Sequence, residues 1–153
     1  MKNPVIYILI NGELNMSPGK AAAQAVHSVM MLNGNSKSDF LSDYRRTVIV
    51  LEAKNSQQIM NLYTYLEQTD VDHDYYIDEG ANEVDAYSIT AMAAFVGDDE
   101  ELRAMFEAFP LYQGNATVKR VDRLGYTEDK VIVQNPVIVD SKWSMRDVKR
   151  NIE

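Results

Sequence analysis

The segment PVIYILIN at residues 4–11 constrains the fold most strongly. It is rich in β-branched and aromatic residues and has no polar residue before Asn11. A run of this length without polar alternation predicts a strand that is buried on both faces. Since predicted helices alternate with this and the other predicted strands, the chain indicates a layered α/β domain in which helices can cover both faces of a short mixed sheet.

Strand and helix patterns alternate along the rest of the chain. Further strands are predicted at residues 47–53, 74–78 and 87–96. Helices are predicted to begin after the capping residues Ser17 and Asn55, over residues 18–32 and 56–68, with others at residues 36–46 and 98–109. Pro18 fits the first helical position, where its missing N–H costs nothing.

The sequence changes character after Pro110. Two strands are predicted at residues 116–124 and 130–140, followed by an amphipathic helix at residues 144–152. An apolar strand pair outside the main domain needs a partner, so we expect homo-oligomerisation through this extension. The alternative is RNA contact, because basic residues are interleaved with aromatic ones there. Those basic residues are Lys119, Arg120, Arg123, Lys130, Lys142, Arg146, Lys149 and Arg150.

Charge is distributed unevenly. The 153 residues carry a net charge of −8; residues 1–109 hold 7 Lys and Arg against 17 Asp and Glu, a net of −10, and residues 110–153 hold 8 against 6, a net of +2. Nucleic-acid binders usually show a basic patch, and the main body is the reverse. The chain has no cysteine, which excludes disulfides, thiolate metal sites and a cysteine nucleophile. The N-terminal apolar run is too short for a signal peptide or a membrane span, so we expect a cytoplasmic protein without membrane contact.

The segment MSPGKAAAQAVHS at residues 16–28 carries the clearest candidate site. Lys20, Gln24 and His27 share one helical face, since they are spaced i, i+4, i+7. That face is either solvated or a ligand site, and Gly19-Lys20 at a helix N-terminus favours an anion. The expected buried side comprises Ala22, Ala23, Val26, Val29 and Met30.

These residues resemble the G-K-x-A-A-Q-x-x-H signature of the type II peptidyl-tRNA hydrolases. The resemblance recurs at Ile77-Asp78-Glu79-Gly80, at Glu83-Val84 and at Ser88-Ile89-Thr90. It covers about residues 4–112, which suggests a family domain at 1–112 and an extension at 113–153. The resemblance implies a three-layer α/β/α sandwich around a short four-stranded mixed sheet, here with a C-terminal β/α extension.

The resemblance also implies an activity, the hydrolysis of the ester between a peptidyl group and the 3′ end of tRNA, without a metal or other cofactor. The implied catalytic residues are Lys20, His27 and Asp78, with Asp78 accepting a proton or orienting His27. The implied substrate-binding residues are Gly19, Gln24, Asn82 and Thr90. His73 is expected to be exposed, and two histidines this far apart in sequence do not make a zinc site.

Several departures from the family pattern leave a second function open. Asn11 stands where the family has an arginine, and Asn15 and Pro18 occupy positions that are often basic. Eight acids within residues 67–86, with no Lys or Arg, either lie on a solvated edge or repel RNA. The alternative function is therefore a catalytically weakened protein of the same fold that binds a nucleotide, a small anionic ligand or a protein partner.

Overall fold

A computed structural model describes residues 4–34, 37–38, 47–80, 83–114, 116–122 and 125–133. The main domain contains four strands, β1 (Val5–Asn11), β2 (Thr47–Ala53), β3 (Asp72–Asp78) and β4 (Ser88–Val96). Its helices are the short 3-10 turn η1 (Gly12–Leu14), α1 (Pro18–Met30), α3 (Ser56–Leu66) and α4 (Glu100–Glu107). Ser17 and Asn55 cap α1 and α3 as predicted, each accepting a hydrogen bond from the backbone N–H three residues on.

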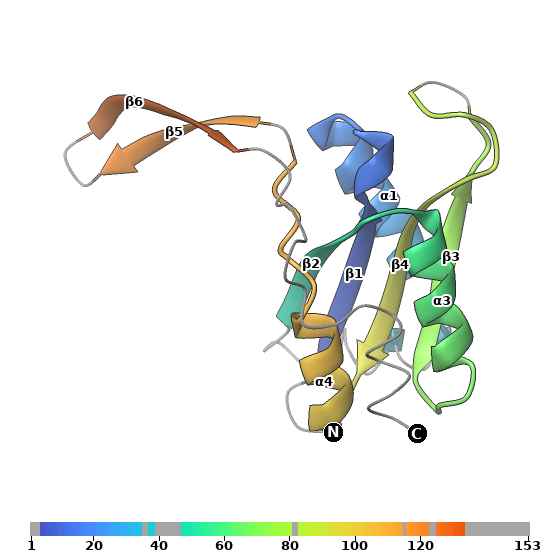
Figure 1. The fold of residues 1–153 in the computed structure, drawn as a ribbon. Helices are drawn as coiled ribbons and strands as arrows, with labels where there is room; N and C mark the ends of the chain where they lie inside the picture. The colour runs from blue at the N-terminus through green and yellow to red at the C-terminus, as the bar shows by residue number, and fades with distance from the viewer. Residues whose placement is uncertain are drawn as a thin grey trace.

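The four strands form one mixed sheet in the order β2-β1-β4-β3 (Figure 1). β1 runs parallel to β2 and antiparallel to β4, and β3 runs antiparallel to β4. All seven residues of β1 are buried, as the apolar run predicted. The expected four-stranded mixed sheet is thus confirmed.

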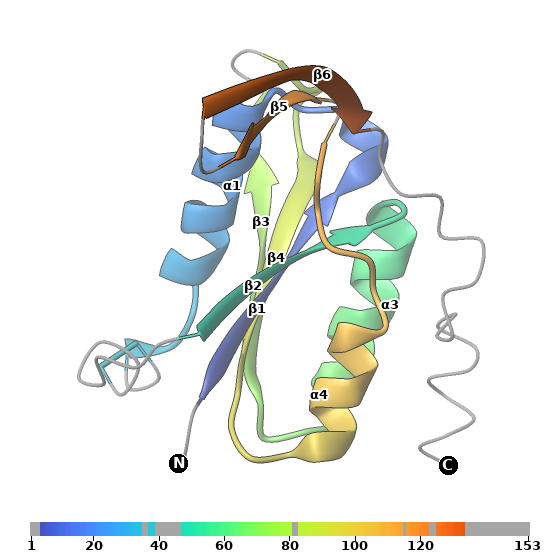
Figure 2. The ribbon, with the colours of Figure 1, turned by 90° about the vertical axis from the view of Figure 1, so that its left-hand side faces the viewer.

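Helices cover both faces of this sheet (Figure 2). Alternate residues of β1 point to opposite faces. Tyr7 and Leu9 belong to the cluster beneath α3 and α4, whereas Ile6, Ile8 and Ile10 belong to the cluster beneath α1. The molecule is therefore the three-layer α/β/α sandwich that the sequence indicated.

The expected burial of α1 was wrong. Ala22 and Ala23 are exposed, and 59% of Val26 and 62% of Met30 is accessible to solvent, whereas Gln24 is only 3% exposed. The polar line faces the sheet because its partners are polar groups on β3 and β4, which the helix sequence alone does not show. The helix approaches the sheet through Ala21 and Ser28 and, in part, Val29.

The C-terminal extension contains an antiparallel hairpin of β5 (Ala116–Asp122) and β6 (Gly125–Val133). The second strand begins five residues before the predicted position, because Asp122 pairs with Gly125 and only two residues separate the strands. Residues 134–140 of the predicted strand and the helix at 144–152 lie outside the described residues, as does most of the helix predicted at 36–46. Homo-oligomerisation through the extension stays a prediction.

Candidate active site

Lys20 and Asp78 form the central pair of the candidate site. Lys20 lies in the first turn of α1 and Asp78 is the last residue of β3. Lys20 Nζ is 2.8 Å from Asp78 Oδ2, and each side chain is only 10% exposed. Two charges this close and this shielded interact more strongly than an exposed pair does. The structure thus brings together two of the three predicted catalytic residues.

The surroundings of Asp78 favour its ionised form. Hydrogen bonding to Lys20 is the largest influence that lowers the pKa of Asp78, and the backbone N–H groups of Glu79 and Gly80 lower it further, against an opposing effect of burial. Gly80 has φ +79°, and a Cβ there would collide with the backbone of Ala86. A glycine is therefore required for the turn that aims these N–H groups at the carboxylate.

Gln24 and Thr90 form a second, fully buried pair. Thr90 Oγ1 donates a hydrogen bond of 2.6 Å to Gln24 Oε1. The register of β3 and β4 shifts here, since Tyr76 pairs with Ala91 and Ile77 pairs with Ile89, so Thr90 is the extra residue of a β-bulge. Strict alternation would place Thr90 on the face of Met92, beneath α3. The bulge turns it toward α1 instead.

His27, the third predicted catalytic residue, lies two helical turns from Lys20. Its ring stacks on Tyr76 with centroids 4.4 Å apart and an interplanar angle of 8°. Among the described residues no hydrogen bond joins His27 to Asp78, whose carboxylate is bound by the Lys20 side chain and by the backbone N–H groups of Glu79 and Gly80. The interpretation that Asp78 orients His27 is therefore replaced by a Lys20–Asp78 pair. The aromatic partner Tyr76 was missed, although it precedes Asp78 by two and so shares its face.

Glu83 occupies the N-terminus of α1. Its carboxylate accepts hydrogen bonds from the backbone N–H of Ser17 at 2.9 Å and from Ser17 Oγ at 2.5 Å. These bonds to Ser17 are the main cause of the lowered pKa of Glu83. A carboxylate of the protein thus sits where the sequence predicted an external anion. Gly19, also predicted to bind substrate, is exposed on this first turn, whereas Asn82 lies outside the described residues.

Asn11 has a structural part in this region. Its side-chain amide donates to Ser56 Oγ and to the backbone oxygen of Ile89, both at 2.9 Å, and its oxygen accepts from Glu13 N at 3.1 Å. The side chain is 1% exposed and ties the end of β1 to α3 and β4. Asn11, which stands where the resemblance predicts an arginine, therefore links β1 to α3 and β4 inside the fold. No spacing rule in the sequence indicated this role.

The acids of residues 67–86 divide between the two ends of β3. Because β3 runs from Asp72, paired with Phe95, to Asp78, paired with Ser88, the acids up to Asp74 lie at the end remote from Lys20. His73, expected to be exposed, lies among them with a side chain only 7% exposed and Nε2 2.8 Å from Glu67. At the Lys20 end, Asp78 and Glu83 are engaged with Lys20 and Ser17. Some of the eight acids therefore lie near the candidate site, and the others lie at the remote end of β3.

Two kinds of feature are absent from the described residues. No group of three or more His, Cys, Asp or Glu side chains there is arranged to hold a metal ion. No helix there combines the length and the apolar character that crossing a bilayer would require.

The fold and the site define the class of protein. A mixed four-stranded sheet between helical layers is the fold that the resemblance implied. Residues 5–112 match the model of the family peptidyl-tRNA hydrolase PTH2. This match spans more than half of the chain, and the protein belongs to that family. A comparison with curated proteins finds no match.

Proposed function

We propose that this chain hydrolyses the ester bond of peptidyl-tRNA, with Asp78 and Lys20 as the reacting groups. The family supplies the class of reaction. The observation that carries the assignment to these residues is the shielded Lys20–Asp78 pair, with Nζ and Oδ2 2.8 Å apart. At the N-terminus of α1 the pair offers an ionised carboxylate that can activate water and a cation that can stabilise an oxyanion, two functions that catalysed ester hydrolysis uses.

In the proposed step, the Asp78 carboxylate accepts a proton from a water molecule. The water oxygen forms a bond to the ester carbonyl carbon, and the negative charge that develops on the carbonyl oxygen is stabilised by the Lys20 ammonium. When the tetrahedral intermediate collapses, the bond to the 3′ oxygen of the tRNA breaks. That oxygen takes the proton held by Asp78, so that a free peptide and a tRNA with a 3′ hydroxyl leave.

Gln24 and Thr90 position the substrate in this proposal. Thr90 holds the Gln24 oxygen and so orients the Gln24 amide nitrogen as a donor. Its two N–H groups are then available to the acceptors of the ester or the terminal ribose. His27, whose ring stacks on Tyr76, is assigned to substrate contact.

The test measures ester cleavage of peptidyl-tRNA by the natural chain and by Asp78→Asn, which keeps the shape of the side chain and removes its charge. Loss of general-base catalysis lowers kcat by about 10²–10⁴-fold. Asp74→Asn is the matched control, because Asp74 lies on the same strand at the end remote from Lys20. Equal cleavage by Asp78→Asn and the natural chain would exclude the proposed roles. A folded natural chain without cleavage would favour ligand binding instead.

A further inference from the structure

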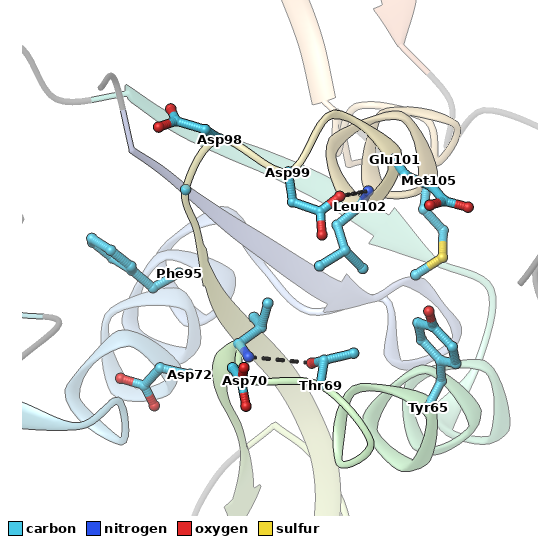
Figure 3. Close-up of a pocket in the computed structure, with 12 residues that line it drawn as sticks. Tyr65, Thr69, Asp70, Asp72, Phe95, Asp98, Asp99, Glu101, Leu102 and Met105 are labelled. Carbon is cyan, nitrogen blue, oxygen red and sulfur yellow. Dashed lines mark hydrogen bonds between the residues drawn. The ribbon is translucent and has the colours of Figure 1, made fainter. Parts of the chain in front are cut away.

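A groove lies at the end of the sheet remote from Lys20, between the start of α4, the end of α3 and the start of β3 (Figure 3). Its volume is about 410 Å³. Tyr65, Leu102 and Met105 form an apolar surface on one side, and their side chains point toward one another in the close-up. The groove is thus distinct from the site at the N-terminus of α1.

The rest of the lining is strongly acidic. Of the described residues that line the groove, five are carboxylates and none is lysine or arginine. The carboxylates are Asp70, Asp72, Asp98, Asp99 and Glu101. Like charges gathered in one concave surface raise the negative potential there, and a cationic partner relieves it. An apolar wall inside an acidic rim suits a segment that carries both aromatic and basic side chains.

The chain itself contains such a segment outside the described residues. Residues 141–150, SKWSMRDVKR, hold four basic residues and one acidic residue, together with the single tryptophan, Trp143. We propose that this segment docks in the groove of its own chain, with Trp143 against the apolar wall and its basic side chains toward the carboxylates. The proposal rests on complementary charge and on apolar complementarity, and it is independent of the hydrolase assignment.

The chain is long enough for this contact. The groove and the N-terminus of α1 lie at opposite ends of the sheet, and nine-residue β4 spans about 30 Å. The chain enters the extension near that N-terminus, where Gly114 lines a small pocket with Ser17, and Val133 pairs with Ala116, so the hairpin returns to where it began. The 10 residues from Val133 to Trp143 reach about 33 Å when fully extended, which slightly exceeds the length of the sheet.

Trp143 fluorescence tests the proposal on the full chain, because no other tryptophan contributes. We expect an emission maximum typical of a shielded indole at low salt, which shifts to longer wavelength as salt screens the contact. Glu101→Lys should produce the same shift at low salt. Glu100→Lys is its matched control, since both residues are exposed in the first turn of α4 and only Glu101 lines the groove. Equal emission from the two variants would overturn the proposal.

A cross-link distinguishes docking within one chain from contact between chains. Because the chain has no cysteine, Gln68→Cys beside the groove and Ser144→Cys in the segment can be joined by a short bismaleimide. Intramolecular cross-linking of dilute protein is expected, and it should be lost when Arg146→Glu and Lys149→Glu are added. The control combines Lys54→Cys with Ser144→Cys, because Lys54 follows β2 at the end of the sheet that is remote from the groove. Absence of a Gln68–Ser144 link, or links only between chains, would refute the proposal.

Discussion

The two ends of β3 present acidic residues in opposite electrostatic surroundings. At its C-terminal end, Asp78 is shielded and paired with Lys20. At its N-terminal end, Asp70 and Asp72 join three further carboxylates around a groove that no lysine or arginine lines in the described chain. The same residue type therefore serves two purposes. One carboxylate is fixed in its charge state by a specific cation, whereas the remote group creates a broad negative potential that attracts a partner.

Beside the loss of Asp78, the largest expected effect comes from removing the cation at the paired end. Lys20→Met should lower kcat for peptidyl-tRNA cleavage by about 10²–10³-fold, because the developing oxyanion loses its stabilising charge. Lys54→Met, which removes an exposed lysine at the end of β2, should leave kcat unchanged. Steady-state cleavage assays of both variants would decide the matter. Comparable kcat values would remove Lys20 from the chemistry.

The pH profile sharpens the same comparison. Lys20 lowers the pKa of Asp78 from its ordinary value of 3.8, so the carboxylate remains ionised down to acidic pH. Because the pKa of Asp78 is lower in the folded chain than in the unfolded chain, its ionised form stabilises the fold. This stabilisation is complete above the unfolded-state pKa and is lost as pH falls through the folded-state pKa. The acid limb of kcat/KM should therefore lie below pH 3.8 in the natural chain, and in Lys20→Met it should move to higher pH. An unmoved limb would show that another group titrates.

A smaller effect is expected from the buried Thr90–Gln24 hydrogen bond. Thr90→Val keeps the shape of the side chain and leaves Gln24 Oε1 without its donor, which costs about 1–3 kcal/mol of unfolding free energy. Thr64→Val on the exposed side of α3 should cost little, since Thr64 Oγ1 donates to the backbone oxygen of Met60 on the helix surface. Urea denaturation of the two variants measures the difference. Similar midpoints would mean that the buried bond contributes no net stability.

The smallest effect belongs to the acidic end. Asp70→Asn removes one of five carboxylates that attract the basic segment, and it should lower the unfolding free energy of the full chain by no more than about 0.5 kcal/mol at low salt. The loss should disappear at high salt because the attraction is then screened. Denaturation at two ionic strengths would check this. A salt-independent loss would point to local backbone effects instead of charge.

Local sequence signals accounted for the elements but not for their orientation. The apolar run of β1 required cover on both faces, and the caps Ser17 and Asn55 are properties of neighbouring residues, so both were predictable. The rotation of α1 was not, because its own apolar positions suggested the opposite face. Polar partners on β3 and β4 outweighed that pattern, and burial of Gln24 required the hydroxyl of Thr90, 66 residues away.

The sequence by itself thus determined the α/β order, the family resemblance and the set of polar residues on α1. Only the tertiary structure decided which of them meet. Lys20 meets Asp78 because the N-terminus of α1 lies beside the C-terminus of β3. Thr90 faces α1 because a bulge breaks the alternation of β4. Acids far apart in the sequence converge on one groove because β3 and α4 begin at the same end of the sheet. Such contacts depend on strand register and on layer packing, which act between residues far apart in the chain and leave no local trace in it.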